Sequence, residues 1–269
     1  MRTITAVTPE MTKSVSVTGK DCSLCCSHCG RRYLAGMEDI RDTIARGPRS
    51  FRSALVSGGM NEAGRVPLDE HLDEIRQMRD WGWRINVHTG LMKMRELGMV
   101  APHADALSID FVYDRLTIEE VYGTDAVPGD YTRLIEDARE FMEPAVHLTI
   151  GLFGGEIRGE YEAIRTLSEM EIKRLVFLVM IPTRGTRYEG RRATPLSEVE
   201  SLISTARDMM PDAAFSLGCM HPRGRYACGL DDICIRNRFE TVTMPGEGFR
   251  LKAAESSLKV IEKKECCAL

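Results

Sequence analysis

The chain has 269 residues, 43% of them hydrophobic and 28% charged, with a net charge of −4. This length suits one large α/β domain, and the weak net charge argues against nucleic acid as an obligatory partner. No stretch approaches the roughly 20 apolar residues that cross a membrane, and residues 1–18 lack the basic start and apolar run of a secretory signal. We therefore expect a cytoplasmic protein without a membrane partner, in which nine cysteines indicate metal or redox chemistry.

Short apolar runs alternate with segments of helical period along the chain, which predicts strand–helix units around a parallel sheet. The run at 175–181 is apolar throughout, as expected of a strand covered on both faces. The predicted strands are 14–18, 54–56, 84–87, 106–109, 146–150, 175–181, 214–217 and 241–244. Eight such units predict a single TIM-type (β/α)8 barrel domain over residues 1–269.

Polar and glycine-rich segments follow the carboxyl ends of these strands. Examples are Ser57-Gly-Gly-Met60 and Gly218-Cys-Met-His-Pro222. Ordinary turns also favour Gly, Pro and Asp. In barrels of this kind, however, the carboxyl face carries the active site, so the succession of such segments predicts a site there.

Three cysteines are closely spaced in the first of these segments, where Cys22, Cys26 and Cys29 form a Cys-x3-Cys-x2-Cys pattern. Three thiolates can hold three irons of a [4Fe–4S] cluster and leave the fourth iron open, whereas clusters normally take four cysteines. Zinc is the competing interpretation, since Cys22/Cys25 and Cys26/Cys29 are also Cys-x2-Cys pairs. Zinc sites usually separate such pairs by a dozen or more residues, and here Cys25 and Cys26 are adjacent. Cys25 is then an extra residue in the loop.

This segment resembles that of the radical S-adenosylmethionine (SAM) enzymes. The resemblance implies that SAM chelates the open iron of a [4Fe–4S] cluster and that an external reductant, ferredoxin- or flavodoxin-like, delivers one electron. It further implies reductive cleavage of SAM to methionine and a 5′-deoxyadenosyl radical, which abstracts hydrogen from a substrate carbon.

The resemblance extends to the expected SAM contacts. It assigns them to His28, Ser57, Gly58, Gly59, Ser108, Asp110, Gly155, Ile157, Gly159 and Ile181. The glycine pair lets backbone carbonyls approach the methionyl ammonium, although Met60 stands where Glu is common. Asp110, with Ser108 two residues before it, is expected to accept hydrogen bonds from the ribose hydroxyls. The alternative is that Asp110 caps a neighbouring helix.

The segment Gly155-Glu-Ile157-Arg-Gly159-Glu-Tyr-Glu162 matches the family's Gly-x-Ile-x-Gly-x-x-Glu motif at every fixed position. By resemblance, Ile157 packs near the adenine, while Gly159 and Glu162 support the backbone there. Ile181 is expected to flank the adenine. His28 precedes the last cysteine, where the family often has an aromatic residue whose backbone meets the adenine amino group, so the resemblance implies that role for His28. The alternative is a solvated loop histidine.

A second cysteine group lies in the segment 219–269. Its members are Cys219, Cys228, Cys234, Cys266 and Cys267. Three or four of them could hold an auxiliary [4Fe–4S] cluster, although free cysteine is often simply buried. Residues 181–186 and 216–224 resemble the biotin synthase homologues that include the subunits of two-component lipoyl synthases. Biotin synthase itself is disfavoured because the middle strands offer Asn86, His88, Ser108 and His147 but no cysteine.

The leading functional hypothesis is therefore sulfur insertion into an octanoyl chain. It implies a sister radical SAM subunit and an acidic lipoyl carrier protein as partners. Six arginines after the sixth and seventh strands could meet that carrier or an anionic substrate, unless they are merely solvated. They are Arg184, Arg187, Arg191, Arg192, Arg223 and Arg225. Two alternatives stay open: a mutase or ring-forming enzyme resembling methylornithine synthase, and a non-catalytic iron–sulfur or zinc scaffold or sensor.

Overall fold

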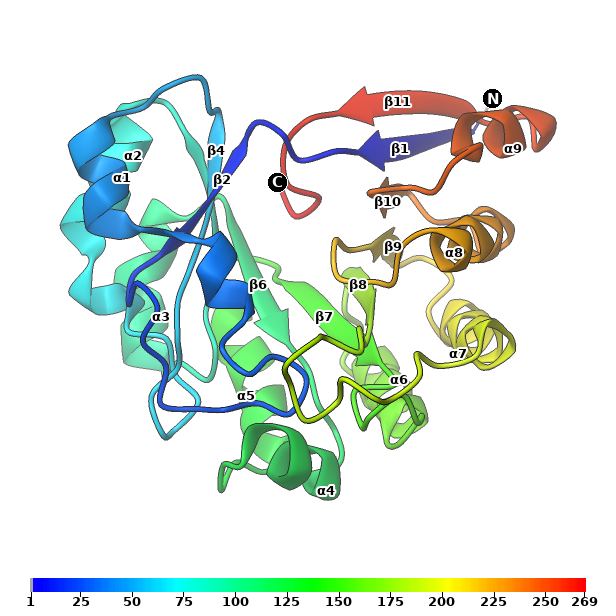
Figure 1. Cartoon of the computed structure of the whole chain (residues 1–269), viewed down its shortest axis with the longest axis horizontal. Coiled ribbons are helices and arrows are strands. Elements are labelled where there is room, and N and C mark those ends of the chain that lie inside the picture. The colour runs from blue at the N-terminus through cyan, green and yellow to red at the C-terminus, as the bar shows by residue number, and fades with distance from the viewer. Residues whose placement is uncertain (1) are drawn as a thin grey trace.

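The computed structural model describes residues 2–269. In this part of the chain, one parallel sheet curls into a half-barrel with the helices on its outer side (Figure 1). The strand order is β11-β1-β10-β9-β8-β7-β6-β5-β4-β2-β3. The strands are β1 (Thr3–Val7), β2 (Thr12–Ser16), β3 (Glu38–Asp39), β4 (Ser53–Ser57), β5 (Arg84–His88), β6 (Ala106–Asp110), β7 (Ala145–Ile150), β8 (Arg174–Val179), β9 (Ala214–Leu217), β10 (Thr241–Thr243) and β11 (Lys259–Lys263).

Helices follow most strands, as the periodicity predicts. They are α1 (Ile40–Arg46), α2 (Leu72–Asp80), α3 (Met94–Val100), α4 (Arg115–Thr117), α5 (Pro128–Arg139), α6 (Glu160–Glu169), α7 (Leu196–Met209), α8 (Arg225–Arg236) and α9 (Phe249–Glu255). Short helical turns add η1 (Tyr33–Gly36), η2 (Leu68–Glu70), η3 (Ala101–His103) and η4 (Ile118–Tyr122). Within residues 2–269, no helix is both long and apolar enough to cross a bilayer.

The expected closed (β/α)8 barrel is not what the strand pairing shows. All eight predicted strands are present, but β1, β3 and β11 were not predicted, and β1 pairs with β10 and β11 while β2 pairs with β3 and β4. The chain bends between β1 and β2 at Thr8-Pro9, where proline cannot donate a ladder hydrogen bond. Residues 3–16 thus supply a strand near each end of the sheet. The two ends are connected by the chain between β1 and β2 and not by hydrogen bonds between those two strands.

The last residues of the sequence fill the amino-terminal end of the half-barrel. Ala268 is 2% exposed and packs on Ala106 and Ala145, the first residues of β6 and β7. Arg174 Nη2 donates to the Ala268 carbonyl at 2.6 Å, and the Cys266 amide donates to Thr12 Oγ1 at 2.8 Å. With this end occupied, the carboxyl ends of the strands are left for a site.

Candidate functional site

The loop after β2 brings three of its four thiols together. The amides of Cys29 and Gly30 both donate to the Cys26 carbonyl, at 3.0 and 2.8 Å, and these turns curl the loop. Burial raises the pKa of Cys26 to about 12, with further upward contributions from Cys29 and Cys22 nearby. Cys25 is exposed, whereas the other three are partly buried. The loop therefore holds Cys22 and Cys29 near enough to Cys26 to affect its ionisation, and it leaves the Cys25 thiol exposed to solvent.

This donor set suits a metal cluster. Crowded, desolvated thiols resist ionisation, and a bound metal reverses this by favouring the thiolate. One of these sulfur atoms already accepts a hydrogen bond from the backbone, because the Met60 amide donates to Cys22 Sγ at 3.3 Å. The residues present thus fit an iron–sulfur cluster, which Cys22, Cys26 and Cys29 would hold.

The glycine turn after β4 presses directly against the cysteine loop. A Cβ on Gly59 would lie 1.9 Å from the Asp21 carbonyl oxygen and 2.7 Å from Cys22 Cα. The Gly59 amide also donates to Thr18 Oγ1 at 2.7 Å. Only glycine fits this contact, so Gly59 positions the cysteine loop as well as being a predicted SAM contact.

The Gly155–Glu162 motif forms a tight turn ahead of α6. Gly155 has φ +98°, and a Cβ there would lie 1.9 Å from the Arg192 carbonyl oxygen. The expectation that Glu162 supports this backbone is wrong: Glu162 is a surface residue paired with Arg165. Glu160 has that role, since it is 5% exposed and accepts hydrogen bonds from the amides of Gly151, at 2.8 Å, and Arg158. Glu160 is the first residue of α6 and directly follows Gly159. This position within the motif was a signal that its carboxylate could bind the amides of the preceding turn.

A cluster of ionisable side chains lies inside the half-barrel where β5, β6 and β7 end. His88 Nε2 is 3.4 Å and His147 Nδ1 is 3.8 Å from Asp110 Oδ1. Burial favours a raised pKa for Asp110, but His88 and then His147 bring it down to about 2. Burial lowers the pKa of His147 to about 4, whereas Asp110 outweighs burial and raises the pKa of His88. Ser108 does not reach Asp110 but donates to Asn86 Oδ1 at 2.9 Å.

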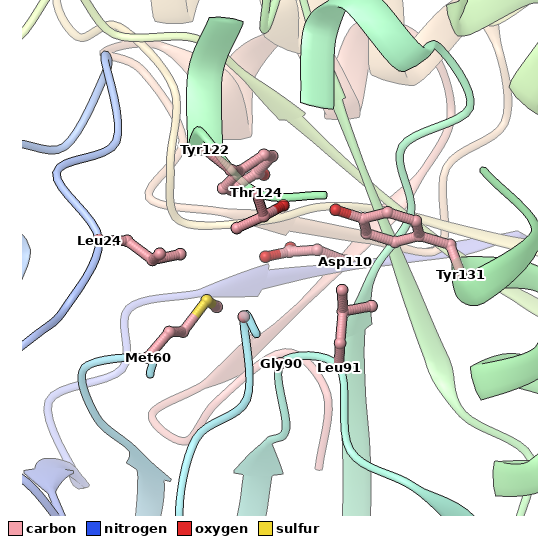
Figure 2. Close-up of a pocket in the computed structure, with 9 residues that line it drawn as sticks. Leu24, Met60, Gly90, Leu91, Asp110, Tyr122, Thr124 and Tyr131 are labelled. Carbon is pink, nitrogen blue, oxygen red and sulfur yellow. The ribbon is translucent and has the colours of Figure 1, made fainter. Parts of the chain in front are cut away.

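A pocket separates this cluster from the cysteine loop. Its empty volume is about 360 Å³, including space open to solvent. The lining residues are Leu24, Met60, Gly64, Gly90, Leu91, Asp110, Tyr122, Thr124 and Tyr131 (Figure 2). Leu24 belongs to the cysteine loop and Met60 to the glycine turn, while Asp110 brings a carboxylate from β6. The pocket therefore lies between the cysteine loop, at Leu24, and a predicted SAM contact, Asp110.

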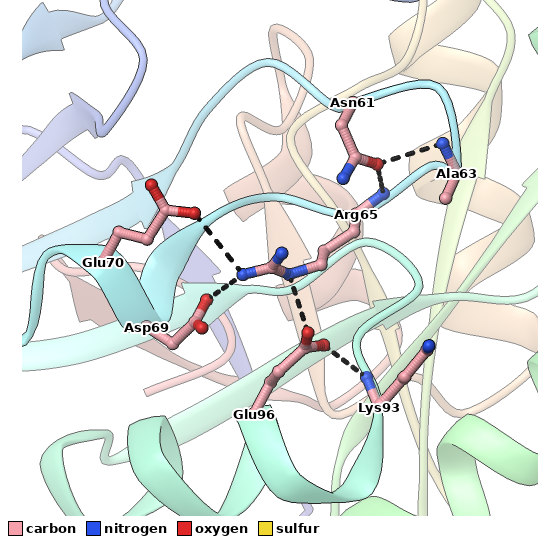
Figure 3. A network of polar contacts seen from close by, with 7 residues as sticks. All are labelled: Asn61, Ala63, Arg65, Asp69, Glu70, Lys93 and Glu96. Carbon is pink, nitrogen blue, oxygen red and sulfur yellow. Dashed lines mark hydrogen bonds and ion pairs between the residues drawn. The ribbon is translucent and has the colours of Figure 1, made fainter.

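The loop between β4 and α2, which lines this pocket at Gly64, is fixed by an ion-pair network that the sequence did not reveal. Arg65 lies among three carboxylates (Figure 3), with its Nε 3.2 Å from Glu96 Oε1 and its Nη2 3.7 Å from Glu70 Oε1. Asp69 is the third partner. These contacts tie the pocket wall to the start of α3.

His28 and Ile181 lie on loops at the same end of the strands. The His28 ring is between Tyr33 and Tyr122, with ring centroids 6.1 and 6.0 Å away, and burial lowers its pKa to about 4. Ile181 lies two residues after the end of β8 and is half-buried, and Ile157 packs partly buried against the core. The roles of these residues toward adenine stay predictions.

The second cysteine group is not one site. Cys266 Sγ accepts a hydrogen bond from Asn86 Nδ2 at 3.4 Å, which places this thiol inside the half-barrel. A hydrogen bond from Cys267 lowers the pKa of Cys266. Cys219 lies near both thiols, because it adds to the effects of Cys266 and burial that raise the pKa of Cys267, and its own pKa is raised by burial and by Cys266. Cys228 and Cys234 lie instead on the outer helix α8, where Cys234 is fully buried in the core. The auxiliary-site expectation therefore divides into three inner and two outer cysteines.

The six arginines lie in the segments after β8 and β9 with exposed side chains. Several are already partnered: Arg187 Nη2 is 2.8 Å from Glu120 Oε1, and Arg223 Nη1 is 2.9 Å from His221 Nε2. Arg184 is 96% exposed and only 3.9 Å from Glu189. The group forms an exposed basic rim.

No family model and no curated protein matches the sequence. Solved structures do share the fold. Methylornithine synthase (PylB) is 19% identical with a TM-score of 0.61, over 90% of this chain and 72% of PylB. The FeFe-hydrogenase maturase HydG from Carboxydothermus hydrogenoformans is 14% identical with a TM-score of 0.65, over 91% of this chain and 61% of HydG. Streptococcus suis SuiB bound to S-adenosylmethionine is 14% identical with a TM-score of 0.55, over 88% and 59%. At these identities the likeness shows the fold alone.

Proposed function

We propose that this protein is a radical SAM enzyme. The carrying observation is the loop after β2, which converges Cys22, Cys26 and Cys29 at the carboxyl end of the sheet beside a pocket that ends at Asp110. The fold likeness to a structure solved with S-adenosylmethionine bound supports the proposal.

Each residue has a defined task in this proposal. When bound, the [4Fe–4S] cluster supplies the electron that cleaves SAM reductively. Cys22, Cys26 and Cys29 hold the cluster, and the Met60 amide stabilises the Cys22 thiolate by its hydrogen bond. Asp110 presents a carboxylate to the pocket for the ribose hydroxyls, and the apolar pocket wall, with Leu24 and Leu91, limits water.

Anaerobic reconstitution tests this proposal. Iron, sulfide and zinc are counted, and 5′-deoxyadenosine is measured after addition of SAM and dithionite. The proposal expects about four irons with sulfide, and cleavage of SAM. Zinc without sulfide would support the scaffold alternative instead, and iron without SAM cleavage would support a sensor.

We further propose sulfur insertion into an octanoyl chain as the reaction. The three cysteines Cys219, Cys266 and Cys267 support it because Cys266 lies against Asn86 of the half-barrel, with Cys267 beside it and the exposed Cys219 near both, so an auxiliary cluster held there could reach a substrate in the half-barrel. A ferredoxin- or flavodoxin-like reductant, a sister radical SAM subunit and an acidic lipoyl carrier protein would be its partners. Incubation with an octanoylated lysine peptide, SAM and dithionite, followed by mass spectrometry, tests for the sulfur-containing product.

A rearrangement or ring-forming reaction like that of methylornithine synthase is the second candidate. The observation that favours it is the charged interior at His88, Asp110 and His147, which suits a polar, zwitterionic substrate better than an alkyl chain. The iron count separates the two reactions. About eight irons favours sulfur insertion, whereas about four favours the rearrangement.

A further inference from the structure

We propose that His88, Asp110 and His147 form a binding site for one divalent transition-metal ion, Zn²⁺ or Fe²⁺, inside the half-barrel. This site is separate from the cysteine loop, but it includes Asp110, which the proposed function also places at the ribose of SAM. The ion itself has no part in the proposed cleavage of SAM. Two imidazoles and one carboxylate are a donor set that such ions take, with further positions left for water or substrate.

The strand register makes the three side chains converge. β5, β6 and β7 are neighbours, Asp110 is paired with His147, and His88 is paired with Ser108, two residues before Asp110. Residues two apart on a strand point to the same face, so the three side chains lie on one face of the sheet, with His88 level with Ser108 and the other two level with each other. One potential ligand atom from each lies within 4.8 Å of the other two.

The separations are those of metal ligands rather than of closed hydrogen bonds. Nitrogen–oxygen hydrogen bonds are about 2.7–3.2 Å long. The two Asp110 contacts are 3.4 and 3.8 Å. Ligand atoms about 2.0–2.1 Å from a tetrahedral ion lie about 3.4 Å apart, so an ion fits between these groups with only small side-chain shifts.

The other ring nitrogen of His147 is buried without a partner in the part of the chain that the structure describes, so no hydrogen bond at that nitrogen prevents the imidazole from turning toward an ion. His147 Nε2 has no hydrogen-bond partner among residues 2–269, and the His147 side chain is 13% exposed. Buried imidazole nitrogens are normally paired, so this ring lacks the second contact that would fix it as a purely structural residue. Ser108 and Asn86, the nearest polar residues on these strands, are bonded to each other.

The site faces the proposed reaction space. Asp110 lines the pocket, and both imidazoles approach its Oδ1, which leaves Oδ2 for another contact. A bound ion would orient a substrate through an oxygen or nitrogen donor, such as a carboxylate, carbonyl or amine. The substrate class implied is therefore a small polar molecule with a chelating group.

Cobalt(II) binding tests the site without any enzymatic readout. The protein is first reconstituted with iron and sulfide, so that the loop cysteines are occupied, then given Co²⁺ and desalted. We expect about one tightly bound cobalt per chain, with ligand-field absorption and no thiolate-to-cobalt charge-transfer band. Absence of bound cobalt, or a thiolate band, would overturn the proposal whatever the variants do.

Substitutions locate the ion. His88→Gln, Asp110→Asn and His147→Gln should each lower cobalt retention at least tenfold, whereas His103→Gln, on the outer turn η3, should not. Cys266→Ser with Cys267→Ser should also keep the cobalt. Loss of cobalt with the cysteines and not with the three ligands contradicts the site. Unchanged cluster iron in the ligand variants shows that they are folded and keeps this result distinct from failure of the radical SAM proposal.

Discussion

The two cysteine groups of this chain differ in how far their spacing determines their geometry. In the first, Cys22, Cys26 and Cys29 lie within one eight-residue loop, so local turns suffice to bring the thiols together. In the second, the same residue type is spread over 219–269, and tertiary packing separates Cys228 and Cys234 on α8 from Cys219, Cys266 and Cys267 inside. Cysteines that are close in sequence therefore predict a shared site by themselves. Cysteines that are far apart in sequence can be assigned to a site only after the fold is known.

Removal of the first group should have the largest effect. Cys22→Ala, Cys26→Ala or Cys29→Ala each deletes a cluster ligand, so we expect at least a hundredfold loss of 5′-deoxyadenosine formation and loss of the cluster absorbance. Cys25→Ala is the matched control, because its thiol is exposed, and it should behave like the wild type. Equal damage from Cys25→Ala would show that the zinc-like pairing was the correct one.

The contact that holds the cysteine loop should be nearly as sensitive. Gly59→Ala forces a Cβ into the Asp21 carbonyl, so the loop must move, and we expect at least a tenfold lower retention of cluster iron after desalting. Gly129→Ala in α5 has no atom within 4 Å of the new Cβ and should retain iron normally. Intact iron binding in Gly59→Ala would mean that the loop tolerates displacement.

Substitutions in the second cysteine group should have different effects on iron content for the three inner cysteines and for the two on α8. Changing Cys219, Cys266 and Cys267 together to Ala should remove about half of eight irons and abolish sulfur insertion, while SAM cleavage survives. Changing Cys228 and Cys234 together should leave the iron content unchanged, although the Cys234 change creates a small cavity in the core. Iron content that follows the outer pair instead would refute the inner auxiliary cluster.

The outer helix that carries Cys228 and Cys234 also holds a buried carboxyl group, Asp231, whose raised pKa should make the stability of the fold depend on pH. Burial raises the pKa of Asp231 from 3.8 to about 6, and its Oδ1 has no hydrogen-bond partner among residues 2–269. A raised pKa contributes stability below pH 3.8 that is lost as the pH rises through 6, about 3 kcal/mol in all and roughly 1.4 kcal/mol between pH 5 and 8. Urea unfolding of wild type and Asp231→Asn at both pH values measures this. The difference in free energy of unfolding between Asp231→Asn and the wild type should shift in favour of the variant by roughly 1.4 kcal/mol from pH 5 to pH 8. A difference that does not change with pH would contradict the raised pKa of Asp231.

The smallest effect is expected at the basic rim. Arg184→Glu with Arg192→Glu should weaken binding of an acidic carrier protein about threefold at low salt and less at high salt, because rim charges mainly affect encounter. Arg41→Glu on α1 is the control, and titration calorimetry or a pull-down at two salt concentrations measures the difference. No change in binding would assign the six arginines to the solvated surface.

The sequence predicted the repeated units well because buried strands such as β8 are apolar over most of their length. It missed β1 and β11, which are short and partly exposed. These two strands pair with each other at one edge of the sheet, after the chain bends at Pro9 between β1 and β2. In the site, the cysteine motif identified the loop, but the packing of Gly59 against that loop was not predicted, and the role of the glycines toward SAM stays a prediction. Motifs could not predict the grouping of His88, Asp110 and His147, because that depends on register across three strands. Likewise, Glu160 rather than Glu162 turned inward because the turn geometry at Gly159 decides which acid faces the core.

Quantitative iron and sulfide analysis of the anaerobically reconstituted protein, followed by SAM and dithionite, tests the central proposal most directly. We predict sulfide-containing iron clusters bound through Cys22, Cys26 and Cys29, and formation of 5′-deoxyadenosine that vanishes when these cysteines are replaced. A protein that binds zinc in place of iron and sulfide, or leaves SAM intact, would contradict it.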